Sequence, residues 1–234
     1  LLAGGKGTRM LSKKAKVLQT LAGKSFLEHI LSSAEGISDK VSIIVGFDKH
    51  AVEKEAVTIL KKVKIYEQKD QIGTADAVKT VIEFVDENEK VLILYGDVPL
   101  IRKNTLKKLF SLNDSLSILT ANVSDPTGYG RVLKDSNGLV EEIIEEKDTN
   151  NQQKNIKEIF TGVMAVNGKI LKELIPLINN NNASKEYYLT DLIGIANSNG
   201  FKIETLSVSW EETLGANTRS EQEKLEQTYR KMKN

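Results

Sequence analysis

The stretch LLAGGKGTRMLSKKAK, at residues 1–16, decides how the rest of the chain is read. Its apolar start leads directly into a turn of small residues, which predicts a strand that ends in a glycine-rich loop. Glycine has no Cβ, so backbone N–H groups can approach an anion closely and form a concavity that binds it. Lys6, Arg9 and Lys16 can neutralise the charge of a polyphosphate. The stretch predicts a nucleotide-phosphate loop, with an ordinary glycine-rich surface turn as the alternative.

This loop differs from the two common glycine-rich phosphate motifs. A Walker loop requires Gly-Lys-Ser/Thr after four intervening residues, whereas this stretch reads Gly-Lys-Gly-Thr-Arg. The dinucleotide fingerprint needs a third glycine, and Met10 stands in that place. A dehydrogenase would also need an acidic residue after the second strand, which this chain does not match. The loop therefore argues against a NAD-dependent dehydrogenase.

Composition narrows the class of protein further. Of the 234 residues, 40% are hydrophobic and 28% charged, with no long apolar run, which predicts a globular protein without a membrane span. The 33 basic and 32 acidic residues nearly cancel, so no global field attracts nucleic acid or an anionic membrane. Cysteine is absent, which excludes disulfides and thiolate chemistry and suits a reducing compartment. The two histidines, His29 and His50, are interpreted as helix-surface residues.

The hydrophobic pattern alternates between strands and helices in the first half of the chain. Strands are predicted at 40–45, 64–67, 91–95 and 116–123, and helices at 24–35, 49–63, 73–85 and 103–112. The run VLILY at 91–95 is the most apolar, as expected of a central strand. Since ligand sites in open α/β sheets lie beyond the carboxyl ends of the strands, the loops after these strands are the place to look for chemistry.

The pattern changes at Asp125. Turn signals at 126–128 and 137–138 bracket a short strand and predict a β-hairpin. The polar stretch at 148–157 that follows is predicted as a loop or a loose helix on the surface. The remaining elements are predicted as strands at 159–166 and 201–208 and helices at 169–178, 189–198 and 219–232. No linker divides the chain. We predict a single domain over 1–234 with two lobes, one at 1–124 and the other, which ends in the terminal helix, at 125–234.

Three loops should converge at one edge of the sheet: the glycine loop, residues 68–74 and residues 95–97. Asp97 lies where a carboxylate would meet Mg²⁺ on a triphosphate, or else it caps a turn before Pro99. Gln68 and Gln71 carry amides that suit the edge of a uracil, although in isolation they are surface polar residues.

Two further positions have a structural and a functional interpretation. Gly73 and Thr74 could present backbone N–H groups to a ligand, or they could only start a helix. Asn217 precedes the last helix and resembles an N-cap two residues early. Its sequence context alone favours the cap.

Ten short strings lie along the chain in a fixed order. They are LLAGGKGTRM, KVL, LAGK, QIGTADAV, LYGDVPLI, DPTGYGRV, EEKD, NNNNAS, EYYLTDL and GANTR. In this order and spacing the chain resembles the N-terminal uridyltransferase domain of bacterial bifunctional N-acetylglucosamine-1-phosphate uridyltransferase/glucosamine-1-phosphate acetyltransferase. The resemblance covers essentially the whole chain. It implies that 1–124 is a nucleotide-binding lobe and that 125–234 is a sugar-phosphate lobe with the terminal helix. The first string marks only the broad sugar-nucleotide pyrophosphorylase superfamily, whereas LYGDVPLI, DPTGYGR and EYYLTD are specific to this family.

The resemblance implies a Rossmann-like α/β nucleotidyltransferase fold, with a mainly parallel central sheet, helices on both faces and a β-hairpin on the sugar side. It also implies Mg²⁺-dependent condensation of UTP with N-acetylglucosamine 1-phosphate, which gives UDP-N-acetylglucosamine and pyrophosphate. That product is a precursor of peptidoglycan and lipopolysaccharide. The expected partners are these two small-molecule substrates, with no nucleic acid or membrane, and the expected location is the cytoplasm.

The resemblance assigns roles to individual residues of this chain. The catalytic residues, which meet the phosphates, are Arg9 and Lys16. The Mg²⁺ ligands are Asp97 and Asn217. The sugar-phosphate residues are Gly130, Glu145, Tyr188 and Thr190. The nucleotide-binding residues are Leu2, Ala3, Gly5, Gly7, Gln68, Gln71, Gly73, Thr74, Tyr95 and Gly96. Asn217 is thereby reassigned from a helix cap to a functional residue.

Two positions depart from the family pattern. Ala15 stands where the family has Pro before the lysine that Lys16 matches, which predicts a looser loop with its charge retained. Phe160 stands where the family has Asn or a similar polar residue that hydrogen-bonds the sugar. Phenylalanine cannot make that bond, and a sugar group left unpaired would cost about 1–3 kcal/mol. Our hypothesis is a weakened affinity for the sugar with the uridyltransfer chemistry intact. Phe160 therefore keeps open a pyrophosphorylase for a different sugar 1-phosphate.

An alternative from another class is a catalytically silent nucleotide-binding module. The four residues Arg9, Lys16, Asp97 and Asn217 argue against it, because a silent module needs none of them. The family's acetyltransferase β-helix, which forms the trimer, has no counterpart in this sequence, and the first strand has only about three residues. We expect a fragment of a bifunctional protein or a stand-alone uridyltransferase, monomeric or weakly oligomeric in this form.

Overall fold

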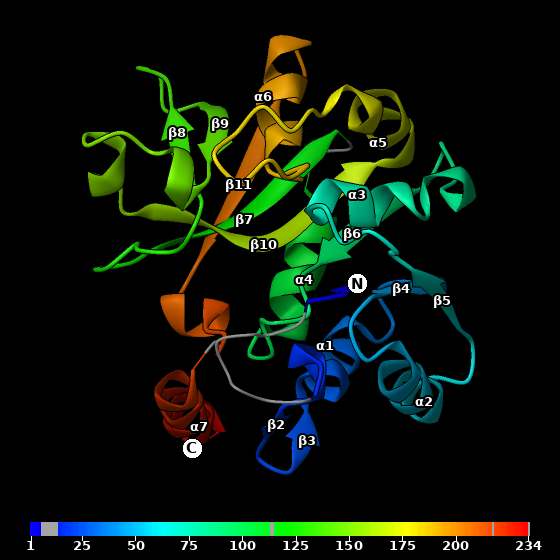
Figure 1. Ribbon diagram of the computed structural model, residues 1–234. Coiled ribbons are helices and arrows are strands. Elements are labelled where there is room, and N and C mark those ends of the chain that lie inside the picture. Colours follow the sequence, from blue (N-terminus) through cyan, green and yellow to red (C-terminus); the bar gives the residue numbers. More distant parts are fainter. Residues whose placement is uncertain (6–13, 113–114, 217, 234) are drawn as a thin grey trace. The chain divides into compact units, whose positions relative to one another are not determined.

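The computed structural model describes residues 1–5, 14–112, 115–216 and 218–233, and the chain divides into two units (Figure 1). Unit 1 consists of Leu1–Lys69, Leu94–Lys107 and Glu211–Asn234. Unit 2 consists of Asp70–Ile93 and Lys108–Trp210. The chain therefore passes between the units several times and does not change units at Asp125. Each predicted lobe is one continuous stretch of sequence, whereas each unit is assembled from separate segments. The single domain stays a prediction.

Unit 1 contains a parallel three-stranded sheet in the order β1-β4-β5 (Figure 1). Most of the helices that contribute to this unit lie wholly within it. The strands are β1 (Leu2–Ala3), β4 (Val41–Val45) and β5 (Val63–Glu67). The helices are α1 (Phe26–Ala34), α2 (Lys49–Ile59) and α7 (Arg219–Lys233), and α4 (Lys103–Phe110) begins here. Short elements are the hairpin β2 (Thr20–Leu21) and β3 (Lys24–Ser25), with the 3-10 turns η2 (Lys16–Leu18) and η7 (Trp210–Thr213).

Local sequence explains the boundaries in unit 1. Ser25 caps α1, because its side chain accepts a hydrogen bond from the backbone N–H of Glu28 at 3.0 Å. The apolar face of α1 is completely buried at Phe26, Leu27 and Ile30. Residues 24–25, predicted as the first turn of this helix, form β3 instead. The buried residues of α1 and β4 give unit 1 its hydrophobic core.

Unit 2 contains a six-stranded sheet in the order β11-β7-β10-β8-β9, with β6 also paired to β10. The strands are β6 (Lys90–Leu94), β7 (Leu116–Asn122), β8 (Arg131–Lys134), β9 (Val140–Ile144), β10 (Glu158–Asn167) and β11 (Ile203–Val208). The helices are α3 (Thr74–Lys79), α5 (Gly168–Leu174) and α6 (Asp191–Ser198). The 3-10 turns are η3 (Ile82–Phe84), η4 (Glu146–Asp148), η5 (Gln153–Asn155) and η6 (Ile175–Leu177).

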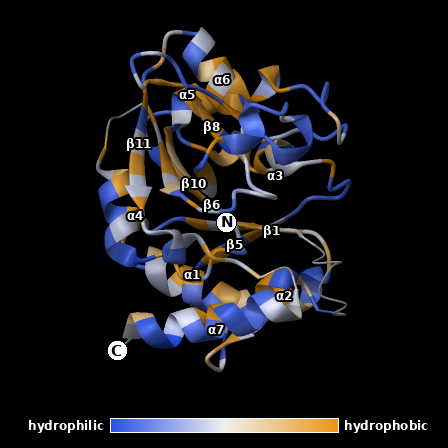
Figure 2. Cartoon of the chain, turned by 90° about the vertical axis from the view of Figure 1, so that its left-hand side faces the viewer, coloured by the Kyte–Doolittle hydropathy of each residue, from blue (hydrophilic) through white to orange (hydrophobic). Residues whose placement is uncertain are grey.

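The sheet of unit 2 is mixed and not mainly parallel. β7 runs parallel to β11 but antiparallel to β10, and β8 and β9 form the predicted antiparallel hairpin. Figure 2 shows β10 largely in hydrophobic colours, whereas α7 of unit 1 is largely hydrophilic. Because β7 pairs with strands that follow Asp125, residues 116–122 join unit 2 and not a separate N-terminal lobe. The α/β class is confirmed, and the antiparallel share of the fold exceeds the predicted hairpin.

The helix predicted at 73–85 is interrupted. α3 ends at Lys79, and the Thr80 hydroxyl donates to the carbonyl oxygen of Ala77 at 2.7 Å before η3 begins. Thr80 and Val81 are adjacent β-branched residues, which favour helix less than the residues around them.

Within the described residues, no helix has both the length and the apolar character needed to cross a membrane.

Candidate functional site

Residues at or just beyond the carboxyl ends of β1, β4 and β6 lie side by side in unit 1. β1 ends at Ala3, and the Gly4 carbonyl then accepts the Phe47 N–H beyond β4 at 3.2 Å. Tyr95 bridges Leu2 in parallel, and the N–H of Gly96 donates to the Leu2 carbonyl at 2.9 Å. The glycine loop therefore starts beside the segment that carries Asp97.

Gln68 lies at the same edge of the sheet. Its N–H donates to the carbonyl of Val45 at 2.8 Å, and the residue is only 6% exposed. A Cβ placed on Gly4 would lie 3.3 Å from the Gln68 amide oxygen. The alternative of a surface polar residue is thus wrong for Gln68. Its amide is buried against the start of the glycine loop.

Lys16 is fixed by the turn η2, whose Val17 and Leu18 are buried. Ala15, the departure from the family's proline, is also fully buried and has φ −55°, a value that proline would share. The Ala15 N–H donates a hydrogen bond to Asp48 Oδ2, with the nitrogen 3.4 Å from the oxygen. Proline could not donate that hydrogen bond, so Ala15 adds a contact where a looser loop was expected.

Lys16 and Asp97 form an ion pair, with the ammonium nitrogen 2.7 Å from carboxylate Oδ2. The side chains are 11% and 37% exposed, so the lysine is nearly buried while the carboxylate still reaches solvent. Asp97 therefore does more than cap a turn before Pro99. The pair is separated by 81 residues in sequence and is created by the meeting of β1 with the segment after β6.

Gly73 and Thr74 belong to unit 2, where they are joined to the segment EYYLTD. The Thr74 hydroxyl accepts the N–H of Leu189 at 2.8 Å, and the Tyr187 carbonyl accepts the N–H of Ala75 at 2.9 Å. Gly73 has φ +138°, and a Cβ there would lie 2.3 Å from the Tyr187 carbonyl oxygen. Only glycine fits this position. Gln71 is exposed on the same loop with φ +48°.

Glu145 and Thr190 are brought together in unit 2. The threonine hydroxyl donates to Glu145 Oε1 at 2.8 Å, and Thr190 is only 1% exposed. Burial raises the pKa of Glu145, and the bond from Thr190 opposes that rise. Burial likewise raises the pKa of the neighbouring Tyr188, against a hydrogen bond with Ser184. Asp191 follows Thr190, and burial with the nearby Glu145 charge raises its pKa to about 6.

Gly130 is the fourth predicted sugar-phosphate residue, and it lies beside Glu145. A Cβ on Gly130 would be 2.8 Å from Ile143 Cγ2 and 3.8 Å from Glu145 Cδ. The Gly130 carbonyl accepts the N–H of Phe160 at 2.9 Å. Phe160, which departs from the family pattern, therefore lies next to Gly130. Phe160 is 5% exposed and lies opposite Thr120 in the β10–β7 pairing.

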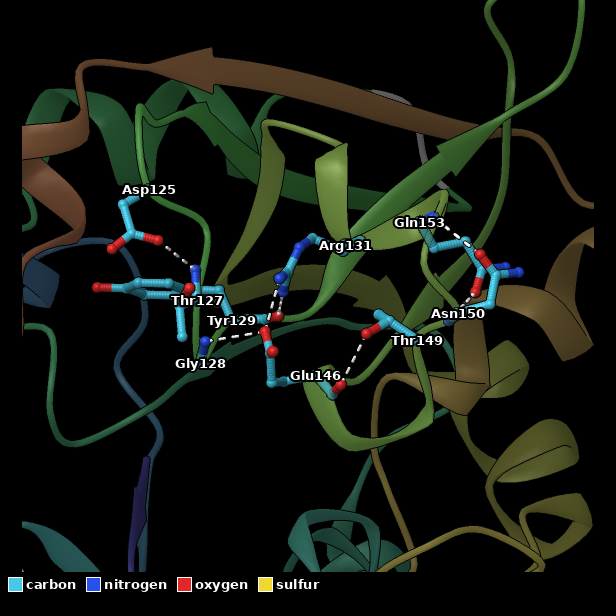
Figure 3. Close-up of polar contacts among 9 residues, drawn as sticks. All are labelled: Asp125, Thr127, Gly128, Tyr129, Arg131, Glu146, Thr149, Asn150 and Gln153. Carbon is cyan, nitrogen blue, oxygen red and sulfur yellow. Dashed lines mark hydrogen bonds and ion pairs between the residues drawn. The ribbon is translucent and has the colours of Figure 1, made fainter.

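Two residues that the sequence did not single out complete this region. Arg131 is 1% exposed and pairs with Glu146, with Nη2 2.6 Å from Oε2 (Figure 3). Both residues stand in strings used for the resemblance, DPTGYGRV and EEKD. An arginine at the start of an alternating strand gives no sign of being buried, so only the fold revealed it.

Three predicted site residues, Gly7, Arg9 and Asn217, lie outside the described residues. In the part of the chain that is described, no group of three or more His, Cys, Asp or Glu side chains could hold a metal ion. The structure thus brings together one predicted set in unit 1 and another in unit 2. The first set is Leu2, Ala3, Gly5, Lys16, Gln68, Tyr95, Gly96 and Asp97. The second set is Gln71, Gly73, Thr74, Gly130, Glu145, Tyr188 and Thr190.

Residues 1–153 match the MobA-like NTP transferase domain. Similar curated proteins include the bifunctional protein GlmU of Saccharophagus degradans, 45% identical over 99% of this chain and 51% of the relative. The protein of the same name from Clostridioides difficile is 39% identical, with the same coverage of 99% and 51%. The chain spans about half the length of these relatives.

Among solved structures, the apo form of a UDP-glucose pyrophosphorylase is similar to this chain with a TM-score of 0.77. The match covers 100% of this chain and 98% of the other, at 16% sequence identity. At that identity the similarity shows the fold alone, which is the nucleotidyltransferase fold that the sequence predicts.

Proposed function

The chain belongs to the MobA-like NTP transferase domain family, and from this premise we propose that it is a nucleotidyltransferase. The proposed reaction condenses UTP with N-acetylglucosamine 1-phosphate to UDP-N-acetylglucosamine and pyrophosphate. The observation that carries the proposal is the Lys16–Asp97 pair at the carboxyl edge of the unit 1 sheet. The choice of substrates is supported by the resemblance over the whole chain and by its identity of 39–45% to the relatives named GlmU.

The chemistry needs charge neutralisation more than proton transfer. An oxygen of the sugar phosphate attacks the α-phosphorus of UTP in line, and the bond from that phosphorus to the pyrophosphate oxygen breaks. Pyrophosphate leaves with the electron pair, so no protein group has to accept a proton. Because attacker and target are both anionic, the protein's work is to position them and neutralise their charge.

Lys16 is the described residue best suited to that work. Its ammonium is bonded to Asp97, and a phosphate oxygen can replace the carboxylate as its partner. Exchange of one anionic partner for another leaves the nearly buried ammonium paired throughout. Arg9 is proposed to share this role.

The donor chemistry at Asp97 fits Mg²⁺. This ion is usually held by one or two carboxylates, with waters and substrate phosphates in its other positions. A single carboxylate whose side chain is 37% exposed meets that requirement, and Asn217 is the proposed second ligand. When bound, Mg²⁺ would reduce the negative charge on the phosphate oxygens.

Four residues of unit 2 are proposed to contact the sugar phosphate, namely Gly130, Glu145, Tyr188 and Thr190. Glu145 is oriented by Thr190, so one carboxylate oxygen has a fixed donor. A pyrophosphorylase for a different sugar 1-phosphate is the less favoured alternative, and Phe160 is the residue that supports it. The Lys16–Asp97 pair argues against a catalytically silent module. We place the enzyme in the cytoplasm, where it would contribute to cell-wall precursors.

The proposal is tested by pyrophosphate release with each nucleoside triphosphate against a panel of sugar 1-phosphates, with and without Mg²⁺. We expect the highest kcat/KM for UTP with N-acetylglucosamine 1-phosphate, and loss of release without the metal. A preference for another sugar would correct the substrate. Release with no pair of substrates, in a folded protein, would overturn the proposed activity.

A further inference from the structure

Arg131 stands out because it is a large, fully buried cation that the proposed reaction does not use. Only 1% of it is exposed, and its Nε makes no hydrogen bond within the described residues. A buried guanidinium is costly unless it is paired and hydrogen-bonded. The contacts that it does make therefore deserve a functional explanation.

Those contacts all hold the segment DPTGYG that precedes Arg131 (Figure 3). Nη1 donates to the carbonyl oxygen of Tyr129, and Nη2 donates to Glu146 Oε2 at 2.6 Å. The same carboxylate oxygen accepts the backbone N–H of Gly128 at 3.0 Å. One carboxylate oxygen thus holds the middle of this segment, at Gly128, and also Arg131, the residue that follows the segment.

Further bonds fix the two sides of this arrangement. On the segment itself, the N–H of Thr127 donates to Asp125 Oδ1, and that of Tyr129 to the carbonyl of Pro126, each at 3.1 Å. On the other side, the Thr149 hydroxyl donates to the carbonyl of Glu146 at 2.8 Å. The bond from Gly128, followed by the bond from Arg131, lowers the pKa of Glu146, as expected for a carboxylate that stays charged.

The residues held in this way adjoin two of the proposed sugar-phosphate residues. Gly130 immediately precedes Arg131, and Glu145 immediately precedes Glu146. A shift of the 125–130 segment relative to η4 would therefore change the distance between the Gly130 backbone and the Glu145 carboxylate. In the structure the two are close enough that a Cβ on Gly130 would lie 3.8 Å from Glu145 Oε1.

We propose that Arg131 and Glu146 are positioning residues that lock the DPTGYG segment, and that this lock sets the spacing of Gly130 and Glu145 for the sugar 1-phosphate. The inference rests on the proposed function, which it deepens by naming residues that act through others. Both side chains are proposed to act through the residues that they hold and not by contact with the reacting phosphates. The lock predicts an effect on the sugar 1-phosphate and none on the nucleotide.

The test measures KM for each substrate, kcat and thermal unfolding for Glu146→Ala, Glu146→Gln and the double variant Arg131→Met/Glu146→Leu. In Glu146→Ala we expect KM for N-acetylglucosamine 1-phosphate to rise about tenfold, with KM for UTP unchanged. Glu146→Gln keeps an oxygen that can accept the Gly128 N–H, so it should recover part of that loss. The double variant replaces the buried pair by apolar side chains, which often preserves folding, but it should bind the sugar 1-phosphate as poorly as Glu146→Ala.

The matched control is Glu158→Gln, which removes the ion pair between Lys134 and Glu158 at 2.6 Å, also within unit 2. It should leave both KM values unchanged. The lock is overturned if the folded variants keep the wild-type KM for the sugar 1-phosphate, or if both KM values rise together. A wild-type protein with no transfer activity would overturn the proposed function and the lock with it, whereas an active wild type with unaltered variants would overturn the lock alone.

Discussion

The Lys16–Asp97 pair of unit 1 and the Glu145–Thr190 pair of unit 2 hold their polar groups in different ways. Asp97 is 37% exposed, and its carboxylate is paired with the ammonium group of Lys16 at the end of a long side chain. Glu145 accepts a hydrogen bond from Thr190, which is 1% exposed. The next residue, Glu146, accepts hydrogen bonds from Arg131 and Gly128. The first pair can exchange partners when an anion arrives. The second is part of a network that is already arranged before any ligand binds, which favours selection of one shape of ligand.

The largest effect should come from removing the exchangeable carboxylate. Asp97→Ala removes the carboxylate that is bonded to Lys16, which is also the proposed Mg²⁺ ligand, so turnover should fall by about 10²–10³-fold or more at saturating Mg²⁺. Pyrophosphate release measures it. Glu67→Gln is the matched control, because it breaks an exposed ion pair with Lys49 at 2.7 Å in the same unit. Near-normal turnover in Asp97→Ala would remove the metal assignment.

The preformed network of unit 2 can be broken at Gly73. In Gly73→Ala the new Cβ would lie 2.3 Å from the Tyr187 carbonyl oxygen at φ +138°, so the two segments must separate. We expect the free energy of unfolding to fall by about 2–5 kcal/mol, measured by denaturant unfolding. Gly200→Ala has the same chemical change at φ +79° with nothing within 4 Å, and should cost only about 1 kcal/mol. Equal losses in the two variants would contradict the close contact.

Phe160 tests whether the network is adapted to one sugar. Phe160→Asn restores the family's polar side chain beside Gly130, and Thr120 opposite has a buried hydroxyl without a hydrogen-bond partner in the described part of the chain. We expect KM for N-acetylglucosamine 1-phosphate to fall by about tenfold, even if the buried substitution lowers stability by about 3 kcal/mol. Phe160→Leu should leave KM as it is. An unchanged KM for N-acetylglucosamine 1-phosphate in Phe160→Asn would contradict the hypothesis of weakened sugar affinity.

The smallest effect concerns pH. Burial, with the charges of Glu145, Asp148 and Glu142, raises the pKa of Asp191 from 3.8 to about 6. A raised pKa disfavours the charged form in the folded protein. The protonated group therefore stabilises the fold below about pH 4, and this contribution is lost as pH rises through about 6. Asp191→Asn should flatten that loss and raise the free energy of unfolding at pH 7 by about 1 kcal/mol, after allowance for solvent screening of a group that is only partly buried.

Asp135 supplies the comparison of opposite sign. Backbone N–H groups of Leu139 and Asn137 lower its pKa, so its stabilising contribution is lost as pH falls. Asp135→Asn should lower stability near neutral pH and have little effect in acid. Urea unfolding at several pH values separates the two variants, and parallel pH profiles would contradict the assignment for Asp191.

Much of the fold was predictable because periodicity and turn residues are local signals. The pattern VSIIV at β4 and the Asn137-Gly138 turn of the β8–β9 hairpin were both located from the sequence. The interleaving of the two units was not predictable in this way. It depends on β7 pairing with β10 and β11, and such long-range pairing leaves no mark on the composition of β7 itself.

The candidate site divides along the same line. Asp97 and Gln68 could be proposed because each follows a predicted strand, and the rule for strand ends places them at one edge. Burial could not be foreseen. Gln68 was equally well a surface residue by sequence, and Arg131 and Glu146 gave no signal, since charged residues are mostly exposed.

By itself the sequence determined the α/β class, the strand ends that precede Gln68 and Asp97, and the resemblance that names the proposed substrates, and it predicted the glycine loop. These depend on the order and local spacing of residues along the chain. The tertiary structure alone decided that Lys16 pairs with Asp97, that Thr74 is joined to Leu189, and that Arg131 is buried on Glu146. Those contacts join residues 15 to 115 positions apart, and their energies depend on burial, which the fold sets and no local pattern records.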